Sequence, residues 1–184
     1  MAQNILAIVQ ARMGSTRFPK KVMCTIEGIP MIELLLRRLA QAKNLSQIIL
    51  ATSNDPGNLP MIEHVRQLGF RVYQGSESDV LDRYYQAAAG DCPDTVVRIT
   101  GDCPLIDPNV VDYVIEQYSK RQVDYASNTH PPTFPDGLDT EVFSFSALQQ
   151  AWKNAKSSNE REHVTPYLRD SGKFRLFNVE NSED

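Results

Sequence analysis

Short apolar runs alternate with segments of helical periodicity along the first two thirds of the chain. These runs cover residues 5–9, 48–52, 71–74 and 96–100. Between them, apolar residues recur three and four positions apart, which places them on one face of a helix. Strands that alternate with helices are typical of a mostly parallel sheet covered by helices on both sides. We therefore predict a three-layer α/β fold.

Prolines and capping residues indicate where the helices begin. Pro30 and Pro60 suit the first turn of a helix, because proline lacks the N–H that a helix start leaves unpaired. A third helix is predicted over residues 79–89, with Ser78 as a possible N-cap. Asp107 is predicted to cap a fourth helix, which opens at the following proline.

The repeating strand and helix pattern ends after residue 125. Residues 128–137 contain three prolines and several turn-forming residues. Beyond them we predict a strand over residues 138–143 and a helix over residues 146–155. Ser157 and Glu160 have capping-box spacing for a further helix that runs through residue 170, and residues 174–179 form a predicted last strand.

The composition fits one domain over residues 1–184. A chain of 184 residues with 41% hydrophobic content can bury roughly 70% of the surface that its unfolded form exposes. A net charge of −4 argues against the broad basic face that nonspecific nucleic-acid binding needs. No apolar stretch has the length of a membrane span, and the chain start lacks a signal-peptide pattern. Three scattered cysteines show no zinc or disulfide spacing. We expect a cytoplasmic protein that binds neither nucleic acid nor membranes.

Positive charge is concentrated in the segment that follows the first predicted strand. Arg12, Arg17, Lys20 and Lys21 fall within ten positions, although the chain is acidic overall. Gly14 could let backbone amides approach an anion, while Ser15 and Thr16 supply hydroxyl donors. Loops that leave the carboxyl ends of parallel strands are where α/β proteins bind ligands. The segment therefore predicts a polyphosphate site, although a solvated basic turn remains the alternative. It matches neither a Walker A loop nor a dinucleotide fingerprint.

A carboxylate follows another predicted core strand. Asp102 stands at the carboxyl end of the strand over residues 96–100, and Gly101 leaves room for a nucleotide against the backbone. A carboxylate at such a position can hold Mg²⁺ while phosphates and waters supply the other oxygen ligands. The alternative is that Asp102 caps a turn before Pro104.

Together these segments resemble the CMP-sugar synthetases, the acylneuraminate and 3-deoxy-manno-octulosonate cytidylyltransferases, and most of all the spore-coat-polysaccharide type. The resemblance is carried by motifs that run in order from residue 10 to residue 167: Ala11-Arg12-x-x-Ser15-Thr16-Arg17-x-Pro19-x-Lys21, Gly75-Ser76-Glu77-x-Asp79-Val80-Leu81-x-Arg83-Tyr84-Tyr85, Gly101-Asp102-x-Pro104-Leu105-Ile106, Asp136-Gly137-Leu138-Asp139-x-Glu141-Val142-Phe143 and Glu160-Arg161-Glu162-His163-Val164-Thr165-Pro166-Tyr167.

The resemblance implies a nucleotide-diphosphosugar transferase fold. It also implies transfer of a cytidylyl group from CTP to a sugar acceptor, with release of pyrophosphate, in surface polysaccharide or glycoconjugate precursor synthesis. Carried over to this chain, it assigns the nucleotide to Arg12, Gly14, Ser15, Arg17, Lys21, Asp79, Arg83, Thr100 and Gly101, with Arg12, Lys21 and Asp102 as catalytic residues and Asp102 as the Mg²⁺ ligand.

The sequence departs from the family pattern in two places. Lys20 stands where the family usually has glycine before its lysine. The family also continues, beyond the position of Asp184, into a segment with W-T-V-D and then P-x-D, whose aspartate is expected to be a second metal ligand. We therefore expect the domain to be incomplete at its C-terminal end.

Four further residues are candidates for sugar binding. Asp139 and Glu141 alternate with apolar residues on a predicted strand and could point together into a sugar pocket, or toward solvent. Arg161 and His163 lie near a predicted helix start, where backbone amides favour an anion such as a sugar carboxylate. Their alternative is a helix surface paired with neighbouring glutamates.

Three other functions remain open at this stage. One is a nucleotidyltransferase that uses another NTP. A second is a glycosyltransferase, which commonly needs a D-x-D metal motif that Asp102-Cys103-Pro104 does not supply. A third is a non-catalytic protein that binds nucleotides or sugar nucleotides. Residues 128–135 also resemble the arm through which relatives dimerise, which predicts a possible homodimer.

Overall fold

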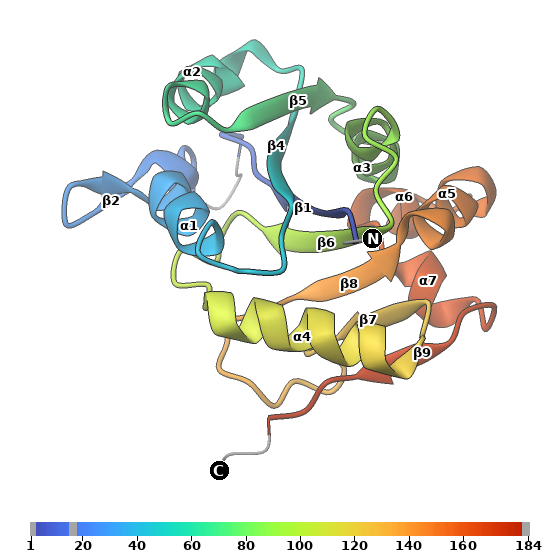
Figure 1. The fold of residues 1–184 in the computed structure, drawn as a ribbon. Coiled ribbons are helices and arrows are strands. Elements are labelled where there is room, and N and C mark those ends of the chain that lie inside the picture. The colour runs from blue at the N-terminus through green and yellow to red at the C-terminus, as the bar shows by residue number, and fades with distance from the viewer. Residues whose placement is uncertain (1–2, 15–17, 182–184) are drawn as a thin grey trace.

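The computed structural model describes residues 3–14 and 18–181, and within them seven strands form one sheet (Figure 1). The strand order is β5-β4-β1-β6-β8-β7-β9. The strands are β1 (Ile5–Gln10), β4 (Gln47–Ser53), β5 (Arg71–Gly75), β6 (Thr95–Thr100), β7 (Tyr125–Ser127), β8 (Glu141–Ser144) and β9 (Leu176–Asn178). A separate two-stranded hairpin contains β2 (Thr25–Ile26) and β3 (Ile29–Pro30).

Helices connect the strands and cover the sheet. They are α1 (Met31–Leu39), α2 (Leu59–Gln67), α3 (Val80–Ala89), α4 (Pro108–Arg121), α5 (Phe145–Asn154), α6 (Ser158–His163) and α7 (Pro166–Asp170), with short 3-10 helices η1 (Lys21–Met23) and η2 (Pro56–Asn58). No helix among the described residues combines the length and apolar character needed to cross a membrane.

The pairing pattern is mostly parallel. Strand β1 lies between β4 and β6 and runs parallel to both, and β5 continues this parallel half. Strand β8 runs antiparallel to β6, so Glu141, its first residue, lies opposite Arg98. The carboxyl ends of β1 and β6 and the start of β8 therefore meet at one edge of the sheet.

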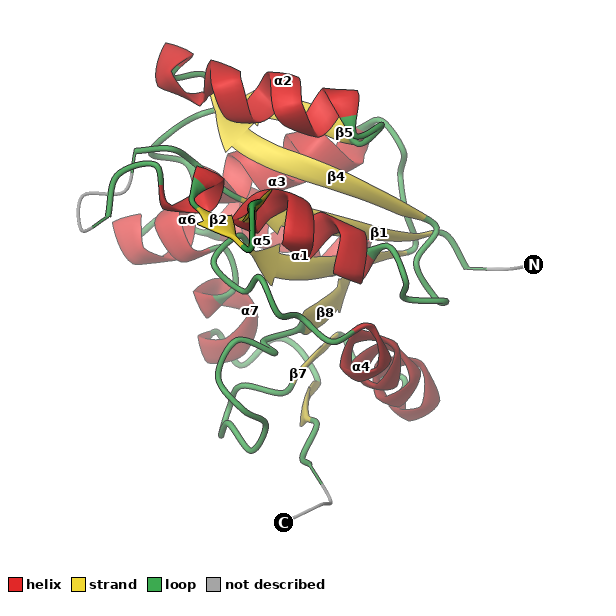
Figure 2. Ribbon diagram, turned by 90° about the vertical axis from the view of Figure 1, so that its left-hand side faces the viewer, coloured by secondary structure: helices red, strands yellow, loops and turns green. Residues whose placement is uncertain are grey.

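Two apolar clusters lie on opposite faces of the sheet. One contains side chains of α1, α2 and α4 together with Val9 and Ile99. The other contains side chains of α3, α5 and α7 together with Ile8 and Val96. In Figure 2, α1 lies in front of the sheet, whereas α3, α5 and α6 lie behind it. The structure confirms the predicted three-layer, mostly parallel α/β fold.

The structure confirms the predicted N-terminal caps of two helices. The Asp107 carboxylate accepts a hydrogen bond from the Asn109 amide at the start of α4. Ser157 and Glu160 form the predicted capping box at the start of α6. The N-cap of α3, however, is Asp79 rather than Ser78, because the Asp79 carboxylate accepts from the Asp82 amide at 2.9 Å.

The boundaries of two predicted elements differ clearly from the sequence predictions. The predicted helix over residues 157–170 is two helices, because Val164 has a φ of 70° and Pro166 starts α7. The predicted strand over residues 138–143 begins only at Glu141. Residues 138–140 instead bind the Asn128 side chain, which donates to the Leu138 carbonyl and accepts from the Thr140 amide. Strand β7 was not predicted.

Candidate active site

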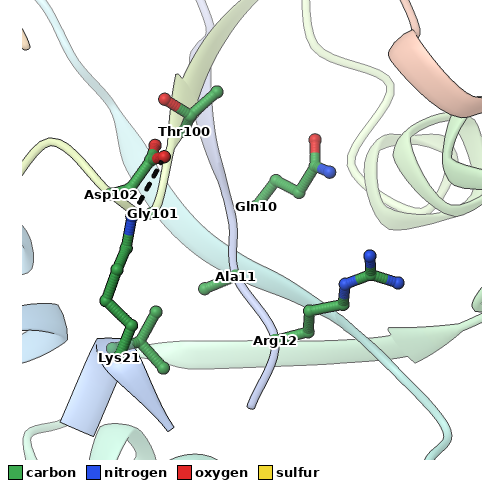
Figure 3. Close-up of a pocket in the computed structure, with 8 residues that line it drawn as sticks. Gln10, Ala11, Arg12, Lys21, Thr100, Gly101 and Asp102 are labelled. Carbon is green, nitrogen blue, oxygen red and sulfur yellow. Dashed lines mark hydrogen bonds and ion pairs between the residues drawn. The ribbon is translucent and has the colours of Figure 1, made fainter. Parts of the chain in front are cut away.

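The carboxyl ends of β1 and β6 approach each other closely, and this contact forms the floor of a cavity of about 240 Å³ (Figure 3). The Gly101 amide donates to the Gln10 carbonyl at 2.7 Å. A Cβ at Gly101 would lie 2.6 Å from the Cβ of Ala11. Only glycine therefore fits here without displacing a strand end. The cavity is lined by Gln10, Ala11, Arg12, Lys21, Val22, Thr100, Gly101 and Asp102.

Opposite charges face each other across this cavity. Lys21 reaches from η1 toward Asp102, with its Nζ 3.3 Å from the carboxylate, and Arg12 lies beyond Ala11 (Figure 3). Burial alone would raise the pKa of Asp102, but a hydrogen bond from Thr100 and the charge of Lys21 outweigh it and hold that pKa below its ordinary value. Asp102 therefore stays ionised and remains a hard oxygen ligand.

A larger cavity of about 880 Å³ adjoins the first and shares Gln10, Arg12 and Asp102 with it. It extends between the start of α3 and α6. Its further lining residues are Glu77, Ser78, Asp79, Val80, Arg83, Lys156, Ser158, Arg161, Glu162 and His163. Four motifs that lie far apart in the sequence are thus brought around one space.

Asp79 and Arg161 form an ion pair that joins the two walls of the larger cavity. Arg161 donates from Nε and Nη2 to the Asp79 carboxylate at 2.5–3.1 Å, and from Nη1 to the Trp152 carbonyl. Arg161 and His163 lie in the last turn of α6, so the predicted position near a helix start is wrong. The pairing with neighbouring glutamates is also wrong for Arg161, and the Glu160 carboxylate instead accepts backbone amides at the start of α6.

Arg83 is a buried cation on the α3 wall. Its relative exposure is 1%, its Nη1 donates to the Ser76 carbonyl at 2.6 Å, and its Nε has no hydrogen-bond partner among the described residues. Burial lowers the pKa of Arg83, and the charge of Arg12 lowers it further. Buried polar groups without a partner are rare in folded proteins, so this guanidinium is a candidate contact for a ligand.

Glu141 is buried, and its carboxylate already has protein partners. Its side chain is 6% exposed, pairs with Arg98, and accepts from the Tyr125 hydroxyl at 2.6 Å. Although burial opposes ionisation, Arg98 and Tyr125 hold the pKa of Glu141 below its ordinary value. The solvent-facing alternative is therefore wrong for Glu141, which also lies outside the linings of both cavities.

Asp139 lies just before β8 rather than on it, so it does not alternate with Glu141 along one strand. Burial raises the pKa of Asp139, and nearby Asp136, Glu141 and Asp102 raise it further. Asp139 therefore belongs to a group of carboxylates on the β8 side of Asp102, outside both cavity linings.

Other candidate residues are placed with less detail. Gly14 is exposed, and apart from its chain neighbours no described residue has an atom within 4 Å of where a Cβ would stand. Ser15, Thr16 and Arg17 lie outside the described residues. Gln10, Glu77 and Lys156 line a cavity but were not predicted as site residues. Gln10 directly precedes a predicted motif and Glu77 lies within one, a signal that could have found them, whereas no sequence signal marks Lys156.

Asp102 is the candidate metal ligand of this site. Among the described residues, no three His, Cys, Asp or Glu side chains are grouped so as to hold a metal ion. A magnesium site that takes one carboxylate from the protein and its remaining oxygens from phosphates and water fits this donor set.

Comparison with known proteins identifies the family. The cytidylyltransferase family matches residues 6–181. The chain belongs to the cytidylyltransferase family. This cytidylyltransferase-family chain is 42% identical over 181 residues to an uncharacterized protein of Methanocaldococcus jannaschii, covering 98% of the chain and 73% of that protein. It is 34% identical over 171 residues to the spore coat polysaccharide biosynthesis protein SpsF of Bacillus subtilis, covering 90% and 70%. The predicted nucleotidyltransferase enzyme class is confirmed.

Further relatives are more distant or shorter in their match. A 3-deoxy-manno-octulosonate cytidylyltransferase of Geobacter sulfurreducens is 36% identical over 114 residues, which cover 61% of the chain and 44% of that enzyme. A solved cytidylyltransferase of Leptospira borgpetersenii superposes with a TM-score of 0.90 at 31% identity, covering all of this chain and 78% of the other. A CMP:2-keto-3-deoxy-manno-octonic acid synthetase complexed with CTP has a TM-score of 0.75 at 19% identity, with 97% and 90% coverage, which supports the fold alone.

Proposed function

We propose that this cytidylyltransferase-family chain transfers a cytidylyl group from CTP to a hydroxyl of a sugar, for surface polysaccharide or glycoconjugate precursor synthesis. The observation that carries the proposal is the cavity at the joined ends of β1 and β6, where Lys21 pairs with the carboxylate of Asp102 and Arg12 belongs to the same lining. Cations bind phosphate oxygens, and a carboxylate beside them suits a divalent cation that accompanies a triphosphate.

The proposed reaction is an in-line displacement. The sugar hydroxyl oxygen forms a bond to the α-phosphorus of CTP, and the bond from that phosphorus to the oxygen bridging to the β-phosphorus breaks. Pyrophosphate leaves with the bonding electrons, and the hydroxyl proton passes to water. Arg12 and Lys21 would hold the phosphates, with Gly14, Ser15 and Arg17 as further predicted contacts. Catalysis in this scheme rests on positioning and charge stabilisation, and it needs no protein nucleophile.

Asp102 would hold Mg²⁺ through its carboxylate, with the hydrogen bond from Thr100 and the depressed pKa keeping that carboxylate ionised. When bound, the metal would neutralise negative charge on the phosphates. Gly101 would let the ends of β1 and β6 meet beneath the nucleotide, since a side chain there would collide with Ala11 and Gln10.

The larger cavity has room for the remaining parts of both substrates. We assign its α3 wall, with Asp79 and Arg83, to the nucleotide. We assign its α6 wall, with Arg161 and His163, to the acceptor. Asp139 and Glu141 stand behind this region at the start of β8, and the burial of Glu141 favours a supporting role over direct sugar contact. Cytoplasmic location and a homodimer formed through residues 128–135 stay predictions.

Pyrophosphate release tests the proposal directly. The protein is incubated with CTP, Mg²⁺ and a panel of keto- and aldo-sugars, and each other NTP replaces CTP in parallel reactions. We expect release that requires CTP and one class of sugar. Release with another NTP instead would assign a different base, and tight CTP binding without release from any sugar would favour the non-catalytic function.

Replacing Asp102 by Asn separates catalysis from folding. Loss of the metal-holding charge should lower kcat/KM by roughly a hundredfold, because metal ions contribute several kcal/mol to charge stabilisation in the transition state. Glu116→Gln is the matched control, since Glu116 also forms an exposed ion pair, with Lys120, away from both cavities. Equal activity of the two variants would remove Asp102 from the metal role.

A further inference from the structure

Asn58 occupies the N-cap position of α2, but its side chain does not cap that helix. Asparagine is among the preferred N-cap residues, because its side-chain oxygen can accept from a free amide of the first turn. The carboxylates of Asp79 and Asp107 do so at the starts of α3 and α4. Asn58 is only 1% exposed, so its polar side chain needs partners inside the protein. Those partners lie outside α2.

The side chain of Asn58 joins the segment after β1 to the end of β4. Its Oδ1 accepts from the Met13 amide at 2.8 Å, and its Nδ2 donates to the carbonyl and to the Oγ of Ser53 at 3.1 and 2.8 Å. Both amide hydrogens are thus used, and a flipped amide would set Nδ2 against the N–H of Met13. These hydrogen bonds therefore allow a single orientation of the side chain.

Met13 is the point from which the cationic segment extends. It directly follows Arg12, which lines both cavities. Its carbonyl accepts from the Lys20 amide at 2.9 Å, so the two ends of the segment over residues 14–19 meet at Met13. Lys20 leads directly into Lys21, the first residue of η1 and part of the first cavity. The backbone of Met13 therefore helps to place cations on both sides of it.

The hydrogen bond to Asn58 holds this backbone from within the protein. Met13 is 8% exposed and belongs to the apolar cluster that contains side chains of α1 and α2. A buried amide that loses its acceptor costs free energy, so the backbone would move toward another partner. Groups that bind a ligand must be held within about 0.5 Å of their productive positions, and such a movement would displace the neighbouring cations.

We propose that Asn58 is a positioning residue of the phosphate site, which acts through Met13 and does not touch the substrate. It lies outside both cavity linings. The role rests on the proposed function, in which Arg12 and Lys21 hold the triphosphate. The side chain that could have capped α2 is used instead to keep the cationic segment in place.

Asn58→Ala tests this role, because it removes the acceptor of the Met13 amide. Affinity for CTP and for inorganic tripolyphosphate, each with Mg²⁺, should fall by roughly tenfold. Isothermal titration without an acceptor sugar gives both dissociation constants. A smaller folded fraction would lower the number of sites per chain and leave the dissociation constant unchanged, so the measurement separates positioning from stability. Wild-type affinity for both ligands would overturn the proposal.

Asn58→Asp should restore most of the lost affinity. Its carboxylate keeps an oxygen for the Met13 amide, and the Ser53 hydroxyl can turn to donate to it. The dissociation constants should stay within about threefold of wild type, although the added negative charge acts against phosphate binding. If this variant were as weak as Asn58→Ala, the hydrogen bond to Met13 would not be what sets the affinity.

Ser53→Ala provides the test if Asn58→Ala does not fold. It removes one of the two bonds that orient the Asn58 amide, while the acceptor of the Met13 amide remains. Affinity for tripolyphosphate should fall by roughly threefold, the usual contribution of one neutral hydrogen bond. Wild-type affinity in this variant would contradict the positioning role.

Asp112→Ala is the matched control. The Asp112 carboxylate accepts from the Lys43 and Asn44 amides at 2.8 and 2.9 Å, so it also holds a loop by its backbone. That loop precedes β4, and Asp112 lies outside both cavity linings. The variant should lose stability and keep wild-type affinity for both ligands. Equal weakening in Asp112→Ala and Asn58→Ala would show a general loss of order and contradict the proposal.

Tripolyphosphate keeps the two proposals distinguishable, because it carries no base and reports on the phosphate contacts alone. If no sugar supports pyrophosphate release, the proposed function fails, while the tripolyphosphate comparison still tests Asn58. If pyrophosphate is released but Asn58→Ala binds both ligands as tightly as wild type, only the positioning role fails.

Discussion

Two pairs of opposite charge lie at the same edge of the sheet, and β6 or the residues just after it supply one member of each. Lys21 and Asp102 have side chains 33% and 55% exposed, whereas those of Arg98 and Glu141 are only 16% and 6% exposed. Solvent screens the first pair, so it adds little to stability and can exchange partners with a ligand. The second pair is desolvated, so each of its charges is stabilised by the other and by the hydrogen bonds around it. The exposure of a charged side chain, rather than its residue type, thus decides whether it can bind a ligand or is needed to stabilise the fold.

Removing the buried carboxylate should have the largest effect on stability. Glu141→Gln leaves Arg98 buried without a counter-charge and should lower the free energy of unfolding by about 3–5 kcal/mol. Asp102→Asn is the exposed counterpart and should change it by less than about 1 kcal/mol. Urea unfolding of both variants measures the difference. Similar losses would remove the distinction between the two pairs.

The same comparison has a predicted pH dependence. The folded state holds the pKa of Glu141 below its ordinary value of 4.5. Its ionised form therefore stabilises the fold above pH 4.5, and that contribution is lost as the pH falls toward the lower folded-state pKa. The difference in the free energy of unfolding between wild type and Glu141→Gln should therefore become smaller as the pH is lowered.

A substitution at the junction of β1 and β6 should have an intermediate effect. Gly101→Ala places a methyl group against Ala11 and the Gln10 carbonyl, so one strand end must move, which should lower the free energy of unfolding by about 1–3 kcal/mol. The shift would also disturb Lys21 and Asp102 and weaken CTP binding. Gly90→Ala is the control, because its φ is −69° and a Cβ there would meet no described residue within 4 Å apart from its chain neighbours. A neutral Gly101→Ala would show that the close contact is not required.

Replacing Asp139 should have the smallest effect, and of opposite sign. Because the folded state raises the pKa of Asp139, the ionised carboxylate opposes folding, and Asp139→Asn should stabilise the protein at neutral pH by less than about 1 kcal/mol. The wild-type penalty is fully present above the raised folded-state pKa and disappears as the pH falls below the ordinary value of 3.8. Thermal melts at pH 7 and pH 3 would reveal it, and a variant less stable at pH 7 would contradict it.

Sequence patterns predicted those parts of the fold that depend on local signals. The core strands β1, β4, β5 and β6 appear as apolar runs, and the caps at Asp107 and Ser157 depend on residues within one helical turn. Strand β7 was missed because a strand of three residues is too short to show a period.

The pairing of charges could not be predicted in the same way. Arg98 and Glu141 stand 43 positions apart, and Asp79 and Arg161 stand 82 apart. The sequence displays each of these charges, but only the packing of α6 on α3 and of β8 on β6 decides which of them meet. This is why Arg161 was predicted as a free anion site and Glu141 as a pocket residue, when each already has a partner.

The chain also contains a built-in optical reporter. Trp152 is its one tryptophan. The indole ring stacks on the Tyr85 ring with their centroids 4.1 Å apart, and its Nε1 donates to the Asp82 carboxylate at 2.8 Å. The backbone carbonyl of Trp152 accepts a hydrogen bond from Arg161. Tryptophan fluorescence therefore originates from one position beside the cavity, so occupancy of that cavity can be followed in solution without attaching a dye.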